Sequence, residues 1–426
     1  MNLLVVGGGG REHAIIKKLK ENPKVETIYA LPGNGGIAQD AVCVPEIGAK
    51  DIPAIVAFAK LHAIDFAVVA PDDPLALGCV DRLHEAGIAC FGPDAKAARI
   101  EASKVFSKNL MKKYGIPTAK YEVFCDADAA LSYLQTADFP IVLKADGLAL
   151  GKGVLIAQNF CEAQDAVKTI MQDKAFGEAG REMVVEEFLT GPEVSVLAFT
   201  DGEAIRPMIS SMDHKRAGDN DTGLNTGGMG TVAPNPYYTA EIAQVCMDTI
   251  FLPTLAAMRA EGCRFKGCLY FGLMLTPDGP KVIEYNCRFG DPETQVVLPL
   301  LKTDLLTVMQ AVENETLAGL NVEWSSGAAA CVILASNGYP AHYEKGKTIT
   351  IPASLPDNVT VYHAGDKRTG DELVTNGGRV LGVTAAAHTL REALYDAYAA
   401  AEAIRFDGKY MRRDIGRRAL AAMEEH

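Results

Sequence analysis

The sequence predicts a multidomain fold of mixed α/β and α+β class that begins with a doubly wound parallel sheet. A chain of 426 residues with 48% apolar content is long enough for about two to four packed domains. Short apolar runs alternate with helical spacing at the start of the chain, whereas strand patterns dominate the middle and the end. We therefore expect three domains, covering residues 1–103, 104–327 and 328–426.

Residues 1–103 show the alternation of strands and helices that is typical of a parallel sheet. Helical spacing covers 11–20 and 74–86, and a further helix is expected over 104–114, before Gly115 and Pro117. Buried strands are expected at 2–6, 25–30, 66–70 and 88–92. This alternation predicts a doubly wound α/β domain.

The middle of the chain is expected to hold strands around a helix at 161–172. A polar, glycine-rich stretch over 211–231 has no periodicity and predicts a long loop, of a length that is often functional. A helix at 240–260 precedes two paired strands, 267–275 and 281–286. Earlier strands are expected at 140–145, 153–157, 183–189 and 193–199.

From residue 328 onward the pattern predicts a small antiparallel sheet with one covering helix at 389–404. The strand candidates there are "AAACVILAS", "KTITI", "VTVYHAG" and "RVLGVTAAA". The C-terminal domain is therefore expected to be of α+β type and mostly antiparallel.

Charge and cysteine usage restrict the class of protein. The net charge of -13 argues against nucleic-acid binding, although a pocket can still concentrate positive charge for a small anion. The ten cysteines contain no C-x-x-C pair, and Met1 leads directly into a core strand rather than a secretory leader. We expect reduced thiols in a cytoplasmic protein. No apolar run approaches about 20 residues, so no membrane span is expected.

The turn "VVGGGGREH" (5–13) follows a strand and opens a helix, but it departs from the dinucleotide fingerprint. With Gly7 and Gly9 as the first two glycines, Glu12 occupies the third position, and the next strand lacks a ribose-binding acid. An NAD-dependent dehydrogenase is therefore disfavoured. Glycines and a helix N-terminus still suit a phosphate or another polar group. A tight turn without a ligand is the alternative.

Two further stretches fit a nucleotide. In "LKADGLALGKGV" (143–154) a glycine loop joins two strands, which describes a flap that can close over a triphosphate while a lysine neutralises its charge. A flexible hairpin with solvated lysines is the alternative. In "VVEEFLTGPEVS" (184–195) backbone groups can read an adenine ring, and Glu193 can accept ribose hydroxyls. An acidic strand end is the alternative there.

The stretch "VIEYNCRFGDPETQ" (282–295) places Glu284, Asn286 and Arg288 on one strand face, because side chains alternate along a strand. Mg²⁺ prefers oxygen ligands, commonly one or two protein groups completed by nucleotide phosphates. Arginine can hold a carboxylate or a phosphate with two parallel bonds. We interpret this strand face as the edge of a site that binds a metal ion, phosphate and substrate. A solvated polar face is the alternative.

Six motifs in this order resemble the phosphoribosylamine–glycine ligase family, which belongs to the ATP-grasp superfamily. The resemblance covers essentially the whole chain, and the order of the motifs carries it more than any single one. The motifs are "GGREHA" (9–14), "KADGLALGKGV" (144–154), "EEFLTGPEVS" (186–195), "DHKRAGDNDTGLNTGGMG" (213–230), "EYNCRFGDPETQ" (284–295) and "TNGGRVLGVTA" (375–385).

The resemblance implies an ATP-dependent condensation of glycine with 5-phosphoribosylamine, through a glycyl phosphate, that gives glycinamide ribonucleotide, ADP and phosphate in de novo purine synthesis. It implies ATP as co-substrate and Mg²⁺ or Mn²⁺ as cofactor. It also implies an ATP-grasp core with a mobile lid over about 121–190. We expect a monomer without nucleic-acid or membrane partners, with transient contacts to other purine-pathway enzymes.

The resemblance also assigns residues. The expected catalytic residues are Lys144, Arg288 and Asp213, and the expected metal ligands are Glu284 and Asn286. ATP contacts are expected from Lys104, Lys144, Gly147, Gly151, Lys152, Gly153, Glu186, Glu187, Leu189 and Glu193. Contacts to glycine and 5-phosphoribosylamine are expected from Gly9, Gly10, Arg11, Asp72, Asp213, His214, Lys215, Asn225, Thr226, Gly227, Gly228, Met229, Gly230, Arg288 and Asp291.

Two departures from the family pattern bear on these assignments. Asp72, in "APD" (70–72), stands where the family suggests Gly-Pro-Glu, which shortens one substrate-contacting acid. The strand 268–275 carries no carboxylate, which leaves Glu284 and Asn286 as the main protein ligands of the metal. Two rival functions remain at this stage: another ATP-grasp ligase with a different acid or amine, and a nucleotide-binding regulator without turnover.

Overall fold

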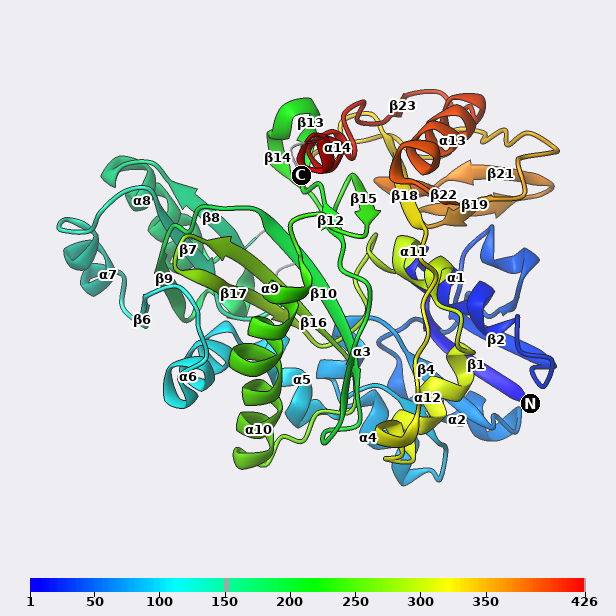
Figure 1. Ribbon diagram of the computed structural model, residues 1–426, viewed down its shortest axis with the longest axis horizontal. Helices are drawn as coiled ribbons and strands as arrows, with labels where there is room; N and C mark the ends of the chain where they lie inside the picture. Colours follow the sequence, from blue (N-terminus) through cyan, green and yellow to red (C-terminus); the bar gives the residue numbers. More distant parts are fainter. Residues whose placement is uncertain (149–152, 425–426) are drawn as a thin grey trace.

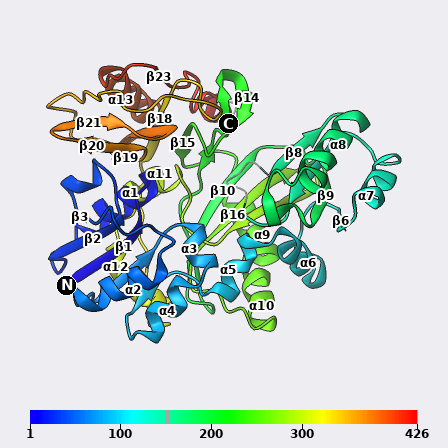
Figure 2. The same ribbon diagram turned by 180° about the vertical axis from the view of Figure 1, so that it is seen from behind.

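The computed structural model describes residues 1–148 and 153–424. In Figure 1 the N-terminal strands (blue) and the C-terminal strands (orange) lie on one side, and the segment holding α7 (Ala127–Leu134) and α8 (Phe160–Val167) projects from the other. Strands β10 (Glu193–Thr200) and β16 (Gly267–Thr276) lie between these parts. Figure 2 shows the same arrangement from behind.

A five-stranded parallel sheet forms the N-terminal part, in the order β3-β2-β1-β4-β5, so the predicted doubly wound sheet is confirmed. The strand order reverses beside β1, and ligands bind such sheets at the carboxyl ends of the strands that flank this point. The strands are β1 (Asn2–Gly7), β2 (Thr27–Pro32), β3 (Val42–Cys43), β4 (Phe66–Val69) and β5 (Cys90–Phe91).

The helices of this part are α1 (Gly10–Leu19), α2 (Ile52–Leu61), α3 (Asp72–Ala76), α4 (Cys79–Glu85) and α5 (Ala95–Ala102). The single helix expected at 74–86 is interrupted between α3 and α4, because Gly78 adopts a φ of 81° there. Helix α6 (Lys104–Tyr114) follows directly and matches the expected range. It begins with a cap in which the Ser103 hydroxyl accepts from the Phe106 N–H at 3.0 Å.

Two antiparallel four-stranded sheets follow. The central sheet has the order β11-β10-β16-β17, with β11 (Ile205–Pro207) and β17 (Gly279–Asn286) at its edges. The outer sheet, in the order β6-β9-β7-β8, packs against α7 and α8. Its strands are β6 (Tyr121–Phe124), β7 (Ile141–Ala145), β8 (Val154–Ala157) and β9 (Met183–Glu187). The strands predicted from the sequence are present in both sheets.

The helical run Ala240–Ala260 combines α9 (Ala240–Cys246), a π-helical turn η5 (Met247–Phe251) and α10 (Leu252–Ala260). By length and composition alone it could cross a membrane, which differs from the expectation that no such stretch exists. In the structure its apolar side packs on the central sheet, with Phe251 4.3 Å from the Phe271 ring. Core packing therefore accounts for its apolar character.

The C-terminal sheet contains strands from two distant parts of the chain. Its order is β12-β15-β18-β22-β19, with β23 paired to β18, and helix α13 (Leu390–Ala403) packs on it. The strands are β12 (Met212–Asp213), β15 (Gly230–Ala233), β18 (Ala328–Ser336), β19 (Val359–His363), β22 (Arg379–Ala387) and β23 (Lys409–Tyr410).

The expectation of a long loop over 211–231 is therefore wrong. The stretch forms β12, the hairpin of β13 (Arg216–Gly218) and β14 (Thr222–Asn225), and β15. A strand of two to four residues is too short to show period-two alternation, and β15 depends on its distant partner β18. The predicted strand "KTITI" forms only isolated bridges at Thr348 and Thr350.

The remaining elements connect these sheets. The hairpin β20 (Asp366–Thr369) and β21 (Glu372–Thr375) follows β19, and α14 (Arg417–Glu424) ends the described chain. Helices α11 (Thr294–Val297) and α12 (Leu305–Glu313) lead from β17 to β18. The short turns are η1 (Ile37–Gln39), η2 (Lys168–Gln172), η3 (Gly177–Gly180), η4 (Asp219–Asp221), η6 (Leu298–Leu300) and η7 (Leu317–Gly319).

Removing the Phe271 ring tests the packing of the central sheet. Phe271 is fully buried between Phe251 and Tyr285, so Phe271→Ala should destabilise the protein by about 3–5 kcal/mol. Urea unfolding followed by circular dichroism measures the change. The control Tyr395→Ala removes an aromatic ring that is 75% exposed and should cost far less. Equal losses in the two variants would contradict this packing.

Candidate functional site

The polar face of β17 is half-buried, because the Glu284 side chain is 34% exposed and Asn286 is also only partly covered. Glu284 pairs in register with Gly272 of β16, and Asn286 pairs with Tyr270. A Cβ atom at Gly272 would lie 3.0 Å from the Glu284 Cγ, so the glycine leaves room for this carboxylate. The neighbouring strand therefore supports the face without supplying a further acid.

Three lysines surround the Glu284 carboxylate. The Lys215 ammonium donates to Glu284 Oε1 at 3.3 Å. Lys215, followed by Lys144 and Lys104, lowers the pKa of Glu284 to about 2, although burial alone would raise it. The carboxylate is thus charged at neutral pH. Three cations around one anion leave a local positive excess that suits a polyphosphate.

Lys144 forms a buried ion pair with Glu186. Its ammonium contacts the Glu186 carboxylate and donates to the Ile283 carbonyl at 3.2 Å. Lys108 contacts the same carboxylate and donates to Thr118 Oγ1 at 2.8 Å. Burial would raise the pKa of Glu186, but the two lysines lower it overall. Glu186 therefore orients Lys144 rather than offering a free carboxylate.

Lys108 was not expected at the site from the sequence. It lies one helical turn after Lys104 on α6, and this i, i+4 spacing was the available signal. Burial lowers the pKa of Lys108 to about 8, although Glu186 partly offsets the effect.

The start of the flap is tied to the N-terminus of α6. The Lys104 ammonium donates to the Gly147 carbonyl at 2.8 Å, and Asp146 accepts from the Val105 N–H at 3.0 Å. Gly147 has a φ of 96°, which favours glycine. Gly153 immediately precedes β8. The predicted flap residues Gly151 and Lys152 lie outside the described residues.

The other expected nucleotide residues extend along and beyond β9. Glu187 faces away from Glu186 and accepts from the Lys120 N–H at 3.0 Å. Leu189 is half-buried, and Glu193 is exposed with a carboxylate oxygen 3.9 Å from the Lys215 ammonium. Glu193 and Lys215 therefore lie at the same edge as Glu284.

Arg288 is a partly buried cation that is paired with Glu101. Its Nη2 donates to Glu101 Oε1 at 2.9 Å, and its Nη1 donates to the Phe289 carbonyl at 3.3 Å. Burial would lower the pKa of Arg288, but Glu101 and Asp72 raise it further than burial lowers it. Its Nε has no hydrogen-bond partner within the described ranges 1–148 and 153–424. This unpaired, buried N–H is available to a bound anion.

Glu101 was likewise not expected at the site, because a single sequence carries no signal for it. Its carboxylate accepts from the Cys287 N–H at 2.7 Å and, at 2.8 Å, from the side-chain amide of Asn286 in the orientation that satisfies its neighbours. Burial raises the pKa of Glu101, and Arg288 opposes the rise. Contact between Glu101 and residues 286–288 depends entirely on the tertiary fold.

Glu284 and Asn286 fit a hard divalent cation. Because the Asn286 NH₂ group is held by Glu101, its carbonyl oxygen faces away from that acid, and Glu284 supplies a charged oxygen two residues earlier. These are oxygen ligands of the kind Mg²⁺ and Mn²⁺ prefer. The described part of the chain contains no group of three or more His, Cys, Asp or Glu that could hold a metal alone. Nucleotide phosphates would have to complete the coordination.

The turn after β1 packs on the segment that follows β17. The Gly9 N–H donates to Glu12 Oε2 at 2.5 Å, which caps α1. Arg11 donates through Nη1 to the Phe289 carbonyl at 3.0 Å, and its N–H reaches Asp291 at 3.4 Å. A Cβ atom at Gly10 would lie 2.6 Å from the Gln295 amide nitrogen, so the turn approaches this segment closely.

Asp72 lies at the carboxyl end of β4, beside this turn. Burial would raise the pKa of Asp72, but Arg288 and Arg11 lower it overall. Arg11, Arg288 and the charged Asp72 thus lie near one another at the carboxyl end of the parallel sheet, where sheets of this topology bind ligands. Burial would likewise raise the pKa of Asp291, but the charges of Arg379 and Arg11 lower it overall.

The segment 213–230 brings Asp213 and Lys215 to the site. Burial, followed by the neighbouring Glu293, raises the pKa of Asp213 well above its usual value. Thr226 donates its hydroxyl to the Lys215 carbonyl at 2.8 Å, and Asn225 pairs with Arg216. A Cβ atom at Gly227, Gly228 or Gly230 would lie 2.8 Å or less from a neighbouring side chain, so these glycines let the segment pack closely. Met229 is fully buried, its N–H donates to the His214 carbonyl at 2.8 Å, and its carbonyl accepts from the Ile333 N–H at 3.2 Å. The expected substrate contact by Met229 is therefore corrected, because its side chain and its backbone groups are used within the protein.

The expectation that His214 contacts substrate is corrected by its hydrogen bonds. Its Nδ1 lies 3.0 Å from the Gly230 carbonyl, and its Nε2 accepts from the Gly416 N–H at 3.1 Å. Burial lowers the pKa of His214 to about 4, so the ring is neutral. Both nitrogens are used within the protein. His214 therefore fixes the segment that carries Asp213 and Lys215.

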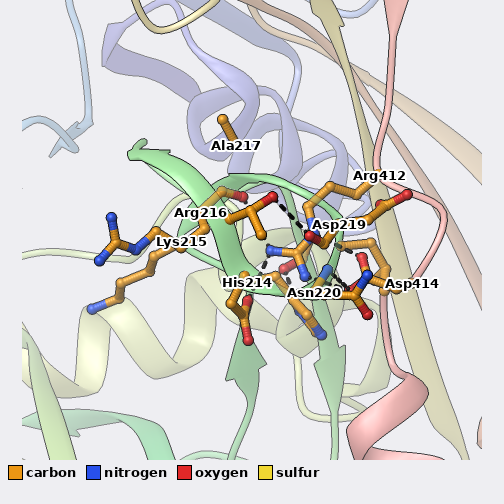
Figure 3. Close-up of polar contacts among 12 residues, drawn as sticks. His214, Lys215, Arg216, Ala217, Asp219, Asn220, Arg412 and Asp414 are labelled. Atoms are coloured by element: carbon orange, nitrogen blue, oxygen red, sulfur yellow. Dashed lines mark hydrogen bonds and ion pairs between the residues drawn. The ribbon is translucent and has the colours of Figure 1, made fainter.

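Residues near the C-terminus hold the β13–β14 hairpin in place through hydrogen bonds (Figure 3). Arg412, which is fully buried, donates to the Arg216 carbonyl at 3.0 Å and to Asp414 Oδ1 at 2.8 Å. Asp414 in turn accepts from the Asn220 N–H at 2.8 Å. Lys215 extends away from this cluster, so the anchoring leaves its ammonium at Glu284.

Arg379 of β22 is a further site neighbour that the sequence analysis did not assign. Its Nη1 donates to the Asp291 carbonyl at 2.7 Å and to the Gly227 carbonyl at 2.8 Å. The hydroxyl of Tyr339 accepts from the Gly227 N–H at 3.1 Å. The C-terminal sheet thus joins the two loops that border the crevice.

Comparisons with known proteins cover nearly the whole chain. The phosphoribosylglycinamide synthetase N domain matches residues 1–101, the ATP-grasp (A) domain of the same family matches 102–294, and its C domain matches 329–418. A phosphoribosylamine–glycine ligase of Vibrio vulnificus (strain YJ016) is 47% identical over 428 residues and covers 100% of both chains.

Two further relatives extend the comparison. A trifunctional purine biosynthetic protein adenosine-3 of Gallus gallus is 48% identical over 99% of this chain, which spans 43% of that protein. The crystal structure of phosphoribosylamine–glycine ligase from Thermotoga maritima aligns with a TM-score of 0.84 at 36% identity, covering 97% of this chain and 100% of that one.

Protonation of His214 should destabilise the protein in acid. The pKa of His214 falls from 6.5 in the unfolded chain to about 4 in the folded protein, so only the unfolded chain binds this proton between these values. Stability should therefore fall as the pH drops from 7 to 5, by about 2 kcal/mol from this group. His214→Asn cannot take up the proton, and its urea-unfolding free energy should depend less on pH by this amount. The exposed His388→Asn is the control; an unchanged pH dependence in His214→Asn would contradict the neutral, buried ring.

Proposed function

The chain belongs to the phosphoribosylglycinamide synthetase family, and from this premise we propose how its residues carry out the reaction. It is an ATP-dependent ligase that joins glycine to 5-phosphoribosylamine in purine biosynthesis. The convergence of Lys104, Lys144 and Lys215 on Glu284 is the structural observation that best supports the assignment of roles. It provides the positive surroundings that a nucleoside triphosphate requires.

We assign the nucleotide to the space between the central and outer sheets. Lys104 and Lys144 would neutralise the phosphates, and the flap that begins at Gly147 would cover them. The adenosine would lie along residues 186–193, with Glu193 at the ribose. Mg²⁺ or Mn²⁺ held by Glu284 and Asn286 would neutralise further phosphate charge.

Glycine and 5-phosphoribosylamine would occupy the crevice on the other side of Glu284. Arg288 would hold the glycine carboxylate through its unpaired Nε–H and its fork, and Asp213 would lie near the glycine ammonium. The sugar phosphate would meet Gly9, Gly10 and Arg11 together with the backbone of 225–230. Asp72 and Asp291 border this crevice from opposite loops.

The chemistry proceeds in two displacements. A carboxylate is a poor acyl donor, because its leaving group would be oxide. Transfer of the γ-phosphoryl group of ATP to a glycine carboxylate oxygen releases ADP and forms glycyl phosphate. The amine of 5-phosphoribosylamine then attacks the carbonyl carbon, phosphate leaves, and the amine gives up a proton. Charge neutralisation and alignment by the residues above account for catalysis without a protein nucleophile.

We also propose a division of labour among the domains. Residues 1–103 would bind the sugar phosphate, residues 104–327 would bind ATP, and residues 328–426 would close the crevice through Arg379 and Tyr339. Movement of the part over about 121–190 would exclude water, which would hydrolyse the acyl phosphate. The fused relative of Gallus gallus supports transient contacts with other purine enzymes.

A coupled assay tests the reaction. ADP release is measured with ATP, Mg²⁺ and glycine, with and without 5-phosphoribosylamine generated in the assay, and the product is identified by mass. ADP and glycinamide ribonucleotide should form together, and only when both substrates are present. Turnover with a different acid or amine alone would contradict the substrate assignment, and tight ATP binding without any turnover would contradict the ligase.

Loss of the Glu284 carboxylate should stop the first displacement. Glu284→Ala removes the metal-side oxygen and leaves three lysines without their shared acid, so kcat should fall by about 10²-fold or more. The control Asp278→Ala removes an exposed acid on the turn of the same hairpin and should leave kcat unchanged. Turnover of Glu284→Ala at the wild-type rate would remove Glu284 from the metal site.

Arg288→Lys tests the glycine site. Lysine keeps the positive charge but loses the planar fork, so the KM for glycine should rise by about tenfold or more while the KM for ATP stays near that of wild type. Arg264→Lys, a surface arginine paired with Glu315, serves as the control. A wild-type KM for glycine in Arg288→Lys would place the glycine carboxylate elsewhere.

A further inference from the structure

We propose that Glu101 is a positioning residue that holds the metal-side amide of Asn286 and the substrate-side guanidinium of Arg288 in a single arrangement. The proposal rests on the roles given above to Asn286 and Arg288. It adds a residue from a different segment of the chain, at the end of α5, and assigns it a role toward both ligands at once.

One buried carboxylate receives three hydrogen bonds from three consecutive residues. Glu101 Oε1 accepts from the Asn286 amide at 2.8 Å and from Arg288 Nη2 at 2.9 Å, while Oε2 accepts from the Cys287 N–H at 2.7 Å. Asn286 ends β17 and Arg288 lies in the bend that follows, yet both side chains reach the same carboxylate. Glu101 thus accepts hydrogen bonds from the Cys287 backbone and from both functional side chains.

The chemistry of the carboxylate decides how the amide of Asn286 points. An ionised carboxylate only accepts hydrogen bonds, so it selects the NH₂ end of an amide. The carbonyl end of Asn286 is then directed away from Glu101, as a metal ligand requires. Without this acceptor the two ends of the amide would be exchangeable, and the NH₂ end would be a poor neighbour for a cation.

The same carboxylate fixes the direction of the Arg288 fork. Arg288 donates from Nη2 to Glu101 and from Nη1 to the Phe289 carbonyl. Its Nε–H has no partner among the described residues. A guanidinium that is mostly buried needs a compensating charge. Glu101 supplies it through the hydrogen bond to Nη2, and the charge of Asp72 also acts on the guanidinium.

Glu101 therefore couples the metal site to the glycine site, because one carboxylate holds both Asn286 and Arg288 in place. Its segment also leads directly into Lys104 of α6, which contacts the flap. Substitution of Glu101 should weaken the binding of the divalent cation and of glycine together, while the adenosine contacts on the outer sheet stay intact. A residue that merely stabilised the fold would not produce this selective pair of effects.

The test compares Glu101→Gln with Asp201→Asn. Asp201 is also buried and accepts from the Ala204 N–H at 2.8 Å and the Leu317 N–H at 3.1 Å, away from the site. Binding is measured on full-length protein: glycine by calorimetry with Mn²⁺ and a non-hydrolysable ATP analogue, Mn²⁺ by electron paramagnetic resonance, and the analogue alone without metal.

In Glu101→Gln the Kd values for glycine and for Mn²⁺ should each rise about tenfold or more, while the Kd for the analogue without metal stays within about twofold of wild type. Asp201→Asn should change none of the three. Wild-type affinities for glycine and Mn²⁺ in Glu101→Gln would overturn the proposal. If Glu101→Gln does not fold, Glu101→Asp keeps the charge and should show a smaller rise in both Kd values; a change in neither would overturn the proposal equally.

A double-mutant cycle separates this inference from the proposed function. If Glu101 acts on glycine through Arg288, the double variant Glu101→Gln/Arg288→Lys should bind glycine about as weakly as Arg288→Lys alone. Fully additive losses would overturn the positioning role. Normal glycine binding in Arg288→Lys would instead refute the proposed glycine site, because that variant does not involve Glu101.

Discussion

Pairing of buried charges is the constraint on which the rest of the site depends. A charge removed from water is costly unless an opposite charge or several hydrogen bonds replace the solvent. Here Glu186 is paired with Lys108 and Lys144, and Arg288 is paired with Glu101. In each pair the partners come from different elements. The sheets must therefore be docked before the functional charges can be buried.

This constraint explains how an acidic protein can hold an anionic nucleotide. The net charge of -13 is spread over the whole chain, whereas three lysines converge on Glu284. A cleft with low-dielectric walls concentrates such a local field, and the charge of the remaining surface matters much less there. The carboxylate keeps the lysines together before the nucleotide arrives. In the proposed site, the nucleotide phosphates would bind among the same lysines.

The C-terminal sheet participates in the site rather than forming a separate unit. Strands β12 and β15 flank the segment that carries Asp213 and Lys215, and both belong to the sheet built on β18. Arg379 bridges Gly227 and Asp291, and Arg412 anchors the hairpin between the two strands. The hairpin is thus fixed on one side by the fold, which leaves Lys215 directed at Glu284. A stretch that resembled a loop is a folded part of the sheet.

The sequence by itself determined the parallel N-terminal sheet, the strands of the outer and central sheets, and the shared strand face of Glu284 and Asn286, whereas Arg288 lies in the bend after β17. These features follow from periodicity and strand alternation, which are local properties of the chain. The tertiary structure alone decided that Glu101 joins the site, that His214 is internally bonded, and that 211–231 contributes strands. These features depend on contacts between residues far apart in the chain, such as the 187-residue separation of Glu101 and Arg288, and local patterns carry no record of such contacts.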